Sequence, residues 1–234
     1  MVEKRDFHNF KFRKKGEKPT FWRKKKKLVE ENAGNCTHPV HICTLLTIYL
    51  PYVNICNNQS VFTKEILMLI LAKNLKQLSF GQLMRVYEEG NLENAASFWP
   101  DLPQGQLLAR AEQEFYAYLD QVFFRTPGSL YCIWQDQNVY VSALRLEPYK
   151  DGLLLEALET APDHRRKGHA FRLMDAMISW LKEQGGGILY SHVGKKNTAS
   201  LGVHEKLGFE RISEMAVYAD GSVDGRCCTL RRKV

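Results

Sequence analysis

The stretch from Thr160 to Ala170 carries residues suited to binding a phosphate. An apolar run ends at Pro162, the basic residues Arg165 to Lys167 follow, and Gly168 opens a helical pattern. The N-terminus of a helix presents unpaired N–H groups and the positive end of the helix dipole. Glycine lets a ligand approach the backbone, and the basic side chains add charge beside a diphosphate. The spacing matches neither a nucleoside-triphosphate loop of the Walker type nor the G-x-G-x-x-G fingerprint.

This turn lies within a regular succession of strands and helices, typical of an α/β fold. A short strand precedes two helices, the first starting after Ser79 and ending at Gly90, the second following a loop over 91–106. A later helix has an inner stripe of Phe171, Met174, Met177, Ile178 and Leu181, and Cys132 is predicted to lie in the core. The predicted strands are Met68–Ala72, Leu130–Trp134, Val139–Leu146, Leu153–Thr160, Ile188–Val193, Phe209–Tyr218 and Cys227–Arg231.

Two motifs resemble those of a known family. Arg165-x-x-Gly168-x-Ala170 resembles R/Q-x-x-G-x-G/A, and the segment from Asn197 to Phe209 resembles N-x-x-A-x-x-x-Y-E-K-x-G-F. Both are signatures of the GNAT superfamily of acyl-CoA-dependent N-acyltransferases, and the resemblance covers residues 68–234. It implies a mixed, mostly antiparallel sheet with flanking helices, in which the central parallel strands 153–160 and 188–193 splay apart.

The resemblance also implies acetyl-CoA as co-substrate, and the sequence predicts no metal. The pantetheine arm would bind along the first splayed strand through Leu158 and Thr160, where a bulge would turn amides outward. An amide near Leu158 could then polarise the thioester carbonyl. The pyrophosphate would lie over the following turn, and Asn197 would cap its helix and touch the cofactor. The predicted cofactor-binding residues of this turn are Arg165, Arg166, Lys167, Gly168, His169, Ala170 and Phe171.

Three residues are candidates for proton transfer. His204 stands where many relatives have the tyrosine that protonates the leaving thiolate, and it either takes that role or packs against the pantetheine. Glu159 and Glu156 lie on the central strand, Glu159 nearer the expected thioester and Glu156 placed to bind a cationic acceptor. Because they are three residues apart, alternation places them on opposite faces unless a bulge intervenes. A water chain is the alternative base.

The function implied is transfer of an acetyl group to a primary amine of a small molecule or peptide, by direct attack in a ternary complex. One alternative is a non-catalytic acyl-CoA sensor, which turnover of acetyl-CoA would distinguish. Another is a nucleic-acid-associated acetyltransferase that uses a basic arm, residues 1–27, and salt-dependent binding that is lost with the arm would support it. The protein is predicted to be a monomer or homodimer.

Charge divides the chain into two parts. Residues 1–27 contain 12 Lys/Arg and three acidic residues, a net charge of +9, whereas the whole chain carries +7, so the remainder carries −2. Residues 1–67 lack a helical or strand period and are predicted to be a disordered extension, with Met68 the natural start of translation. Reading the nucleotides before codon 68, and comparing a 68–234 fragment with the full chain, would check this start.

The remaining features indicate a cytoplasmic protein with reduced cysteines. The six cysteines have no spacing typical of a small disulfide-linked domain. Cys36, His38, His41 and Cys43 are ligand types for zinc, but their spacing fits no known zinc pattern. The longest apolar stretch, residues 42–50, is shorter than the roughly 20 residues that cross a membrane, so no membrane partner is predicted.

Overall fold

The computed structural model describes residues 67–234. The predicted basic arm and the Cys36–Cys43 group lie outside this part of the chain. The predicted extension over residues 1–67 also lies outside it, except for Leu67. Leu67 itself lies in the first strand of the sheet, one residue before the predicted strand start at Met68. The fold from this strand to the C-terminus is the one relevant to the site.

A seven-stranded sheet runs through the molecule in the order β1-β2-β3-β4-β5-β9-β6. Only the β4–β5 pair is parallel among these strands, and every other pairing is antiparallel. The predicted fold class, a mixed and mostly antiparallel sheet with a central parallel pair, is therefore confirmed. The strands are β1 (Leu67–Ala72), β2 (Leu130–Asp136), β3 (Val139–Tyr149), β4 (Gly152–Thr160), β5 (Ile188–Gly194), β6 (Glu210–Ser213) and β9 (Cys227–Lys233).

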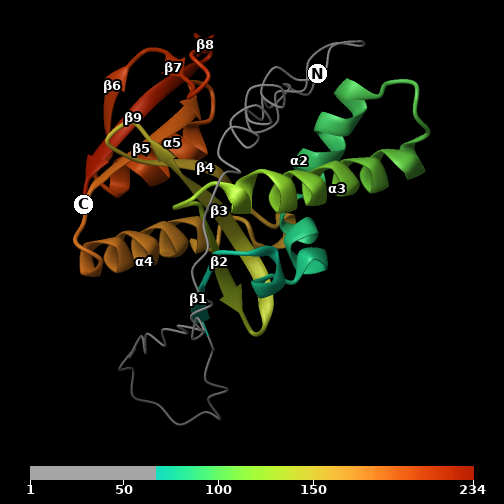
Figure 1. The fold of residues 1–234 in the computed structure, drawn as a ribbon, viewed down its shortest axis with the longest axis horizontal. Coiled ribbons are helices and arrows are strands. Elements are labelled where there is room, and N and C mark those ends of the chain that lie inside the picture. Colours follow the sequence, from blue (N-terminus) through green and yellow to red (C-terminus); the bar gives the residue numbers. More distant parts are fainter. Residues whose placement is uncertain (1–66) are drawn as a thin grey trace, which may run out of the picture.

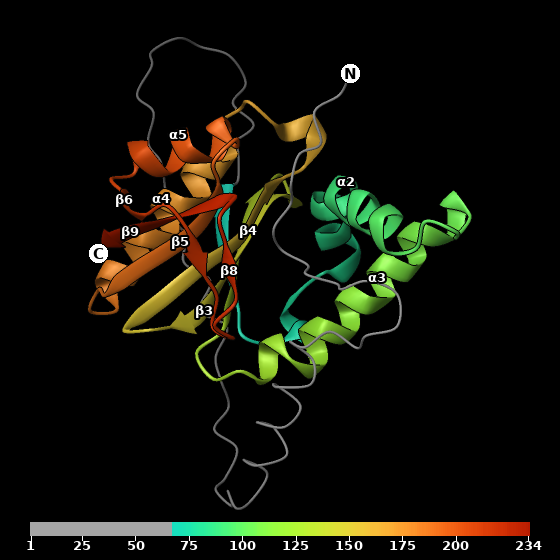
Figure 2. The same cartoon turned by 90° about the horizontal axis from the view of Figure 1, so that it is seen from above.

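Helices cover both faces of this sheet, as Figures 1 and 2 show. The helix α4 packs on one face over a core that includes Leu155, Met177 and Cys132, and Cys132 is fully buried as predicted. The pair α2 and α3 packs on the other face over a core that includes Leu83, Phe115 and Ala157. The helices are α2 (Phe80–Phe98), α3 (Gln104–Gln121), α4 (His169–Glu183) and α5 (Thr198–Lys206), with single turns η1 (Leu75–Gln77), η2 (Phe123–Arg125) and η3 (Pro162–His164).

The helix α2 is longer than predicted. Gly90 does not end it, and the predicted loop over 91–106 shrinks to residues 99–103. A glycine inside a helix costs only about 1 kcal/mol relative to alanine. Asn91 and Ala95 are buried on the same helix, and the Trp99 N–H still donates to the Ala95 carbonyl at 2.8 Å. Burial beyond Gly90 therefore outweighs the local stop signal.

Two further predictions from local pattern were wrong. The single strand predicted over Phe209–Tyr218 is split into β6 and β7 (Ala216–Val217), and β7 pairs with β8 (Val223–Asp224) in a separate ribbon. The Ser213 hydroxyl accepts the Met215 N–H at 3.1 Å, a local turn that interrupts the strand. Phe171, which was predicted to belong to the inner stripe of α4, is instead 37% exposed. It lies in the first turn of this helix, next to its N-terminus.

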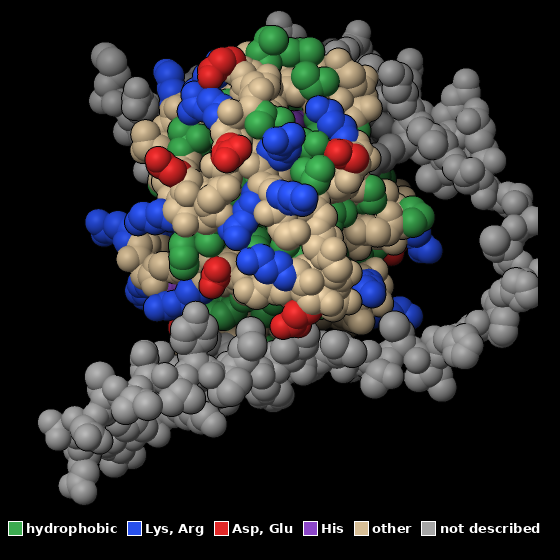
Figure 3. All heavy atoms as spheres, turned by 90° about the vertical axis from the view of Figure 1, so that its left-hand side faces the viewer, with side chains coloured by type: hydrophobic (Ala, Val, Ile, Leu, Met, Phe, Trp, Pro, Cys, Tyr) green, Lys and Arg blue, Asp and Glu red, His purple; other side chains and the backbone are tan. Residues whose placement is uncertain are grey.

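The surface away from α2 and α3 is mixed in charge. On the face that carries β6, β9 and the end of α4, Lys and Arg side chains are interspersed with Asp and Glu (Figure 3). Small groups of hydrophobic side chains lie between them. No helix within residues 67–234 combines the length and the hydropathy that crossing a bilayer requires.

Candidate active site

The central parallel strands separate soon after they pair. Residues of β4 and β5 are in register only from Leu153↔Leu189 to Leu155↔Ser191, and beyond these pairs the two strands diverge. The β4 edge from Glu156 to Thr160 therefore faces the gap between the strands without a ladder partner on β5. The predicted splay of these two strands is present in the fold.

A bulge in β4 lies at the start of this gap. Arg145 of β3 faces Glu156 and Ala143 faces Glu159, so Leu144 is opposite two residues of β4 rather than one. Ala157 takes the left-handed conformation there, with φ of 54°. A non-glycine residue in this region stores strain of about 1–3 kcal/mol, a feature that is concentrated at functional sites.

The bulge changes which side chains share a face. Leu155 and Leu158 both pack into the core under α4, although they are three residues apart. Glu156 and Glu159 are therefore both on the opposite face, toward α2 and α3, where strict alternation would have separated them. The condition attached to the sequence prediction, a bulge between the two glutamates, is met.

A pocket lies in the gap between the diverging strands. It brings together five of the residues predicted from the sequence, from β4 and from the start and end of α5, and adds others from β5 and the β7–β8 turn. The predicted residues that line it are Glu156, Leu158, Glu159, Asn197 and His204. The residues Arg165 to Phe171 do not line it, but lie on the turn after β4 and in the first turn of α4.

Glu159 is the carboxylate in this pocket with a strongly altered acidity. Burial is the main cause that raises its pKa to about 7, and the nearby Glu89 and Glu93 act in the same direction. Arg165 opposes the shift. A carboxyl group with a pKa near neutrality exchanges its proton readily at physiological pH, which is the property required of a general base.

Glu156 has a different environment. Its carboxylate lies 3.7 Å from the guanidinium of Arg145, whose side chain is 2% exposed. The same guanidinium lies over the rings of Tyr118 and Phe123, at 5.1 and 5.7 Å from their centroids. Glu156 therefore neutralises a buried cation, and this pairing accounts for a carboxylate on an apolar strand. The prediction that it binds a cationic acceptor stays a prediction.

Replacing Glu156 by glutamine should therefore destabilise the protein. We expect the free energy of unfolding to fall by about 1–3 kcal/mol, because the buried charge of Arg145 loses the carboxylate that lies 3.7 Å from it. Urea unfolding followed by circular dichroism measures this change. Glu88→Gln, on the exposed side of α2, is the matched control and should have no effect. Equal stability of the two variants would contradict the neutralising role.

His204 is held from both sides of its ring. It is 1% exposed, and its Nδ1 lies 2.8 Å from the Ser200 carbonyl oxygen. A carbonyl only accepts, so Nδ1 carries the proton and Nε2 accepts the hydroxyl of Ser191 at 3.0 Å. Burial lowers the pKa of His204, partly offset by the bond to Ser200. In this tautomer the ring can release a proton from Nε2 only after becoming an imidazolium.

The sequence analysis missed three polar residues of the pocket. Ser191 and His192 come from β5, and Tyr218 comes from the turn between β7 and β8. The rings of His192 and Tyr218 meet edge to face at 5.0 Å between centroids. Burial is the main cause that raises the pKa of the Tyr218 hydroxyl, so this group keeps its proton at neutral pH. No local motif marks these residues, because only the fold brings them to the gap.

The turn after β4 has the backbone of an anion site. Gly168 is the N-cap of α4 in the left-handed conformation, with φ of 79°, and Arg166 also has a positive φ of 62°. Such conformations next to a helix start turn consecutive N–H groups toward one point. Arg166, Lys167 and Gly168 are exposed, so a ligand can reach them.

Arg165 contributes differently from the prediction. Its Nε donates to the Thr160 carbonyl at 3.1 Å, and its terminal nitrogen lies 2.6 Å from a carboxylate oxygen of Glu89. Its guanidinium therefore ties the turn to α2. Asn197 caps α5 as predicted, since its side-chain oxygen accepts the Ser200 N–H at 3.0 Å. The predictions that these residues bind a cofactor stay predictions.

Comparison with known proteins decides the family. The model described as "Acetyltransferase (GNAT) family" matches residues 92–209, from within α2 to the end of the α5 motif. The chain belongs to the GNAT family. The match includes β4, the turn at Gly168 and α5, so all the pocket-lining residues except Tyr218 lie within the matched segment.

Solved structures resemble this GNAT domain in fold. A proposed acetyltransferase from Acinetobacter baylyi has a TM-score of 0.51 at 12% identity, over 74% of this chain and 95% of that one. The PaiA N-acetyltransferase from Thermoplasma acidophilum, in complex with coenzyme A, has a TM-score of 0.47 at 14% identity, over 71% and 99% of the two chains.

A third structure is the ribosomal-protein-S18-alanine N-acetyltransferase from Escherichia coli, with a TM-score of 0.41 at 19% identity. It covers 53% of this chain and 76% of that one. No curated protein matches the sequence significantly. At 12% identity the Acinetobacter baylyi structure shows a likeness of fold alone, so the acceptor has to be inferred from the site.

Proposed function

We propose that residues 68–234 transfer an acetyl group from acetyl-CoA to a primary amine of a small molecule or peptide. The observation that carries this proposal is Glu159, a half-buried carboxyl group with a pKa of about 7 that lines the gap between β4 and β5. A base of this kind is useful when a nucleophile must lose a proton near neutral pH, as an ammonium group does before it attacks a thioester.

In the proposed reaction the acceptor amine enters from the side of α2 and α3, where Glu159 accepts its proton. The neutral nitrogen then attacks the thioester carbonyl, and the amide of Leu158 polarises the carbonyl oxygen. The C–N bond forms as the C–S bond breaks, the thiolate takes up a proton from its donor to leave as coenzyme A, and the nitrogen loses its second proton, which restores the donor. The turn at Arg166–Phe171 holds the diphosphate, so positioning supplies part of the rate.

The proton for the thiolate comes from a group that is protonated while Glu159 is ionised. Burial lowers the pKa of His204 below its ordinary value of about 6.5, whereas Glu159 ionises near 7. An imidazolium and an ionised Glu159 therefore coexist in only a small fraction of molecules. Tyr218 remains protonated throughout this range, so we assign it as the donor and assign His204 to positioning Ser191.

The donor can be identified from variants of both residues. Tyr218→Phe should lower kcat at least tenfold with little change in acetyl-CoA affinity, because the phenol proton is lost and the ring remains. His204→Gln tests the other assignment, in which kcat falls roughly 10²–10⁴-fold and the wild-type rate declines as pH rises through the pKa of the histidine. Full activity of Tyr218→Phe together with that pH decline would return the role to His204.

Catalysis itself is tested by screening amines with acetyl-CoA and measuring the thiol that is released. Turnover with any amine supports the proposal. Tight binding of acetyl-CoA without turnover across small amines, polyamines and peptide N-termini would favour the non-catalytic acyl-CoA sensor. The nucleic-acid-associated alternative depends on residues 1–27, which lie outside the described part of the chain.

A further inference from the structure

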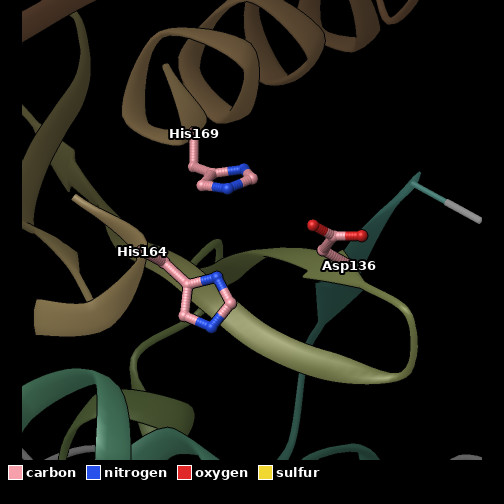
Figure 4. A group of neighbouring side chains, drawn as sticks. All are labelled: Asp136, His164 and His169. Atoms are coloured by element: carbon pink, nitrogen blue, oxygen red, sulfur yellow. The ribbon is translucent and has the colours of Figure 1, made fainter. Parts of the chain in front are cut away.

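Three metal-ligating side chains converge beside the anion site. Asp136 ends β2, His164 belongs to η3, and His169 begins α4. One ligand atom from each lies within 4.8 Å of the other two, and Figure 4 shows the three side chains pointing toward a common centre. The two rings have centroids 5.8 Å apart at an interplanar angle of 59°, so they are not stacked on each other.

Three polar atoms of this group, one from each side chain, are buried without hydrogen bonds. Oδ1 of Asp136 and Nδ1 of both histidines have no hydrogen-bond partner among residues 67–234. His169 is only 4% exposed. A buried polar atom without a partner costs about 1–3 kcal/mol, and three in one place indicate a ligand that satisfies them together.

We propose that Asp136, His164 and His169 bind a divalent transition-metal ion of the zinc type. Two imidazoles and a carboxylate are the donor set that suits zinc, cobalt or iron rather than magnesium or calcium. Zinc–nitrogen and zinc–oxygen bonds of about 2.0–2.2 Å bring ligand atoms to within roughly 3.5 Å of one another. The ligand atoms, which lie within 4.8 Å of one another without the ion, must therefore move about 1 Å closer together on binding.

The position of the site gives the ion a structural task. His164 and His169 flank the turn from Arg165 to Gly168, and Asp136 anchors them to the end of β2. A bound ion therefore fixes both ends of the turn that forms the anion site. The sequence predicts no metal because its ligands come from three segments, and neither His164 nor His169 belongs to a familiar zinc motif.

The test is a zinc titration of the full chain, stripped with EDTA and dialysed, against a chromophoric zinc chelator. We expect tight binding in the wild type, and a loss of more than about 100-fold in Asp136→Asn and His164→Gln, because even a residue behind the ligands typically contributes 10–100-fold. Asp136→Glu keeps a carboxylate and should retain part of the affinity. The matched control is the double variant His38→Gln/His41→Gln, which removes the two histidines that stand between Cys36 and Cys43 in the sequence.

Cobalt binding gives a second measurement that does not depend on the variants folding. Cobalt held by two imidazoles and a carboxylate lacks the thiolate charge-transfer absorption that ligation by Cys36 or Cys43 would produce. Zinc affinity that is equal in wild type and His164→Gln, or that disappears only in the His38/His41 variant, would overturn the proposal. Absence of any tight zinc binding in the wild type would also overturn it.

Discussion

Glu159→Gln is expected to lower kcat/KM by roughly 10²–10⁴-fold, the usual contribution of general acid–base catalysis. Glutamine keeps the size and the hydrogen-bonding ability of the side chain but cannot take a proton from the acceptor amine. The wild-type rate should rise with pH through about 7 and then level off, because Glu159 is active only when ionised and its pKa is about 7. This rising limb should disappear in the variant.

The measurement requires an acceptor amine whose own pKa lies well above the pH range studied, so that it remains an ammonium group throughout and the limb reports the ionisation of the enzyme. Glu93→Gln is the matched control, because Glu93 is exposed on α2 and raises the pKa of Glu159 through its charge. This variant should keep the plateau rate and move the limb to lower pH. A Glu159→Gln enzyme with the wild-type rate would exclude Glu159 as the base.

Stability provides an independent readout of the same ionisation. The folded-state pKa of Glu159 lies above its ordinary value of 4.5, so the folded protein binds the proton more tightly than the unfolded chain. The contribution of this group to stability therefore falls as pH rises from about 4.5 through 7. Urea unfolding at several pH values should show a smaller decline for Glu159→Gln than for the wild type.

The sheet and the strand-to-helix turn at Gly168 could be predicted because their signals are local. The strand ending at Thr160, the basic residues and Gly168 are consecutive in the sequence, so their spacing alone indicates a strand-to-helix turn. The parallel pair of strands followed from the family resemblance. Gly90 is the counterexample, since a local stop signal was overruled by the burial of Asn91 and Ala95 farther along α2.

The pocket could be predicted only in part. Whether Glu156 and Glu159 share a face depends on the bulge at Ala157, and β-strand alternation alone cannot locate a bulge. The separation of their roles depends on Arg145, a residue of the neighbouring strand. Tyr218 reaches the gap through the β7–β8 turn, and its contact with His192 has no counterpart in sequence spacing.

Gly168→Glu is expected to weaken acetyl-CoA binding by about 100-fold while the protein stays folded. A Cβ at this position would meet no heavy atom within 4 Å, so the substitution does not clash with the fold. The cost to the fold is the left-handed conformation at φ of 79°, roughly 1–2 kcal/mol for a residue other than glycine. The added carboxylate would lie where the diphosphate is proposed to bind, and like charges in contact cost several kcal/mol of binding free energy. Because about 1.4 kcal/mol corresponds to a tenfold change in affinity, a loss of about 100-fold is expected.

Gly168→Gln separates charge from shape, because it carries the same strain and nearly the same volume without the charge. Calorimetric titration with acetyl-CoA should order the affinities as wild type, then Gly168→Gln, then Gly168→Glu. The gap between the last two should narrow at high ionic strength, since the anion site is exposed and salt screens its charges. If folded Gly168→Glu bound acetyl-CoA as tightly as the wild type, the diphosphate would have to lie elsewhere, and the turn before α4 would not be its site.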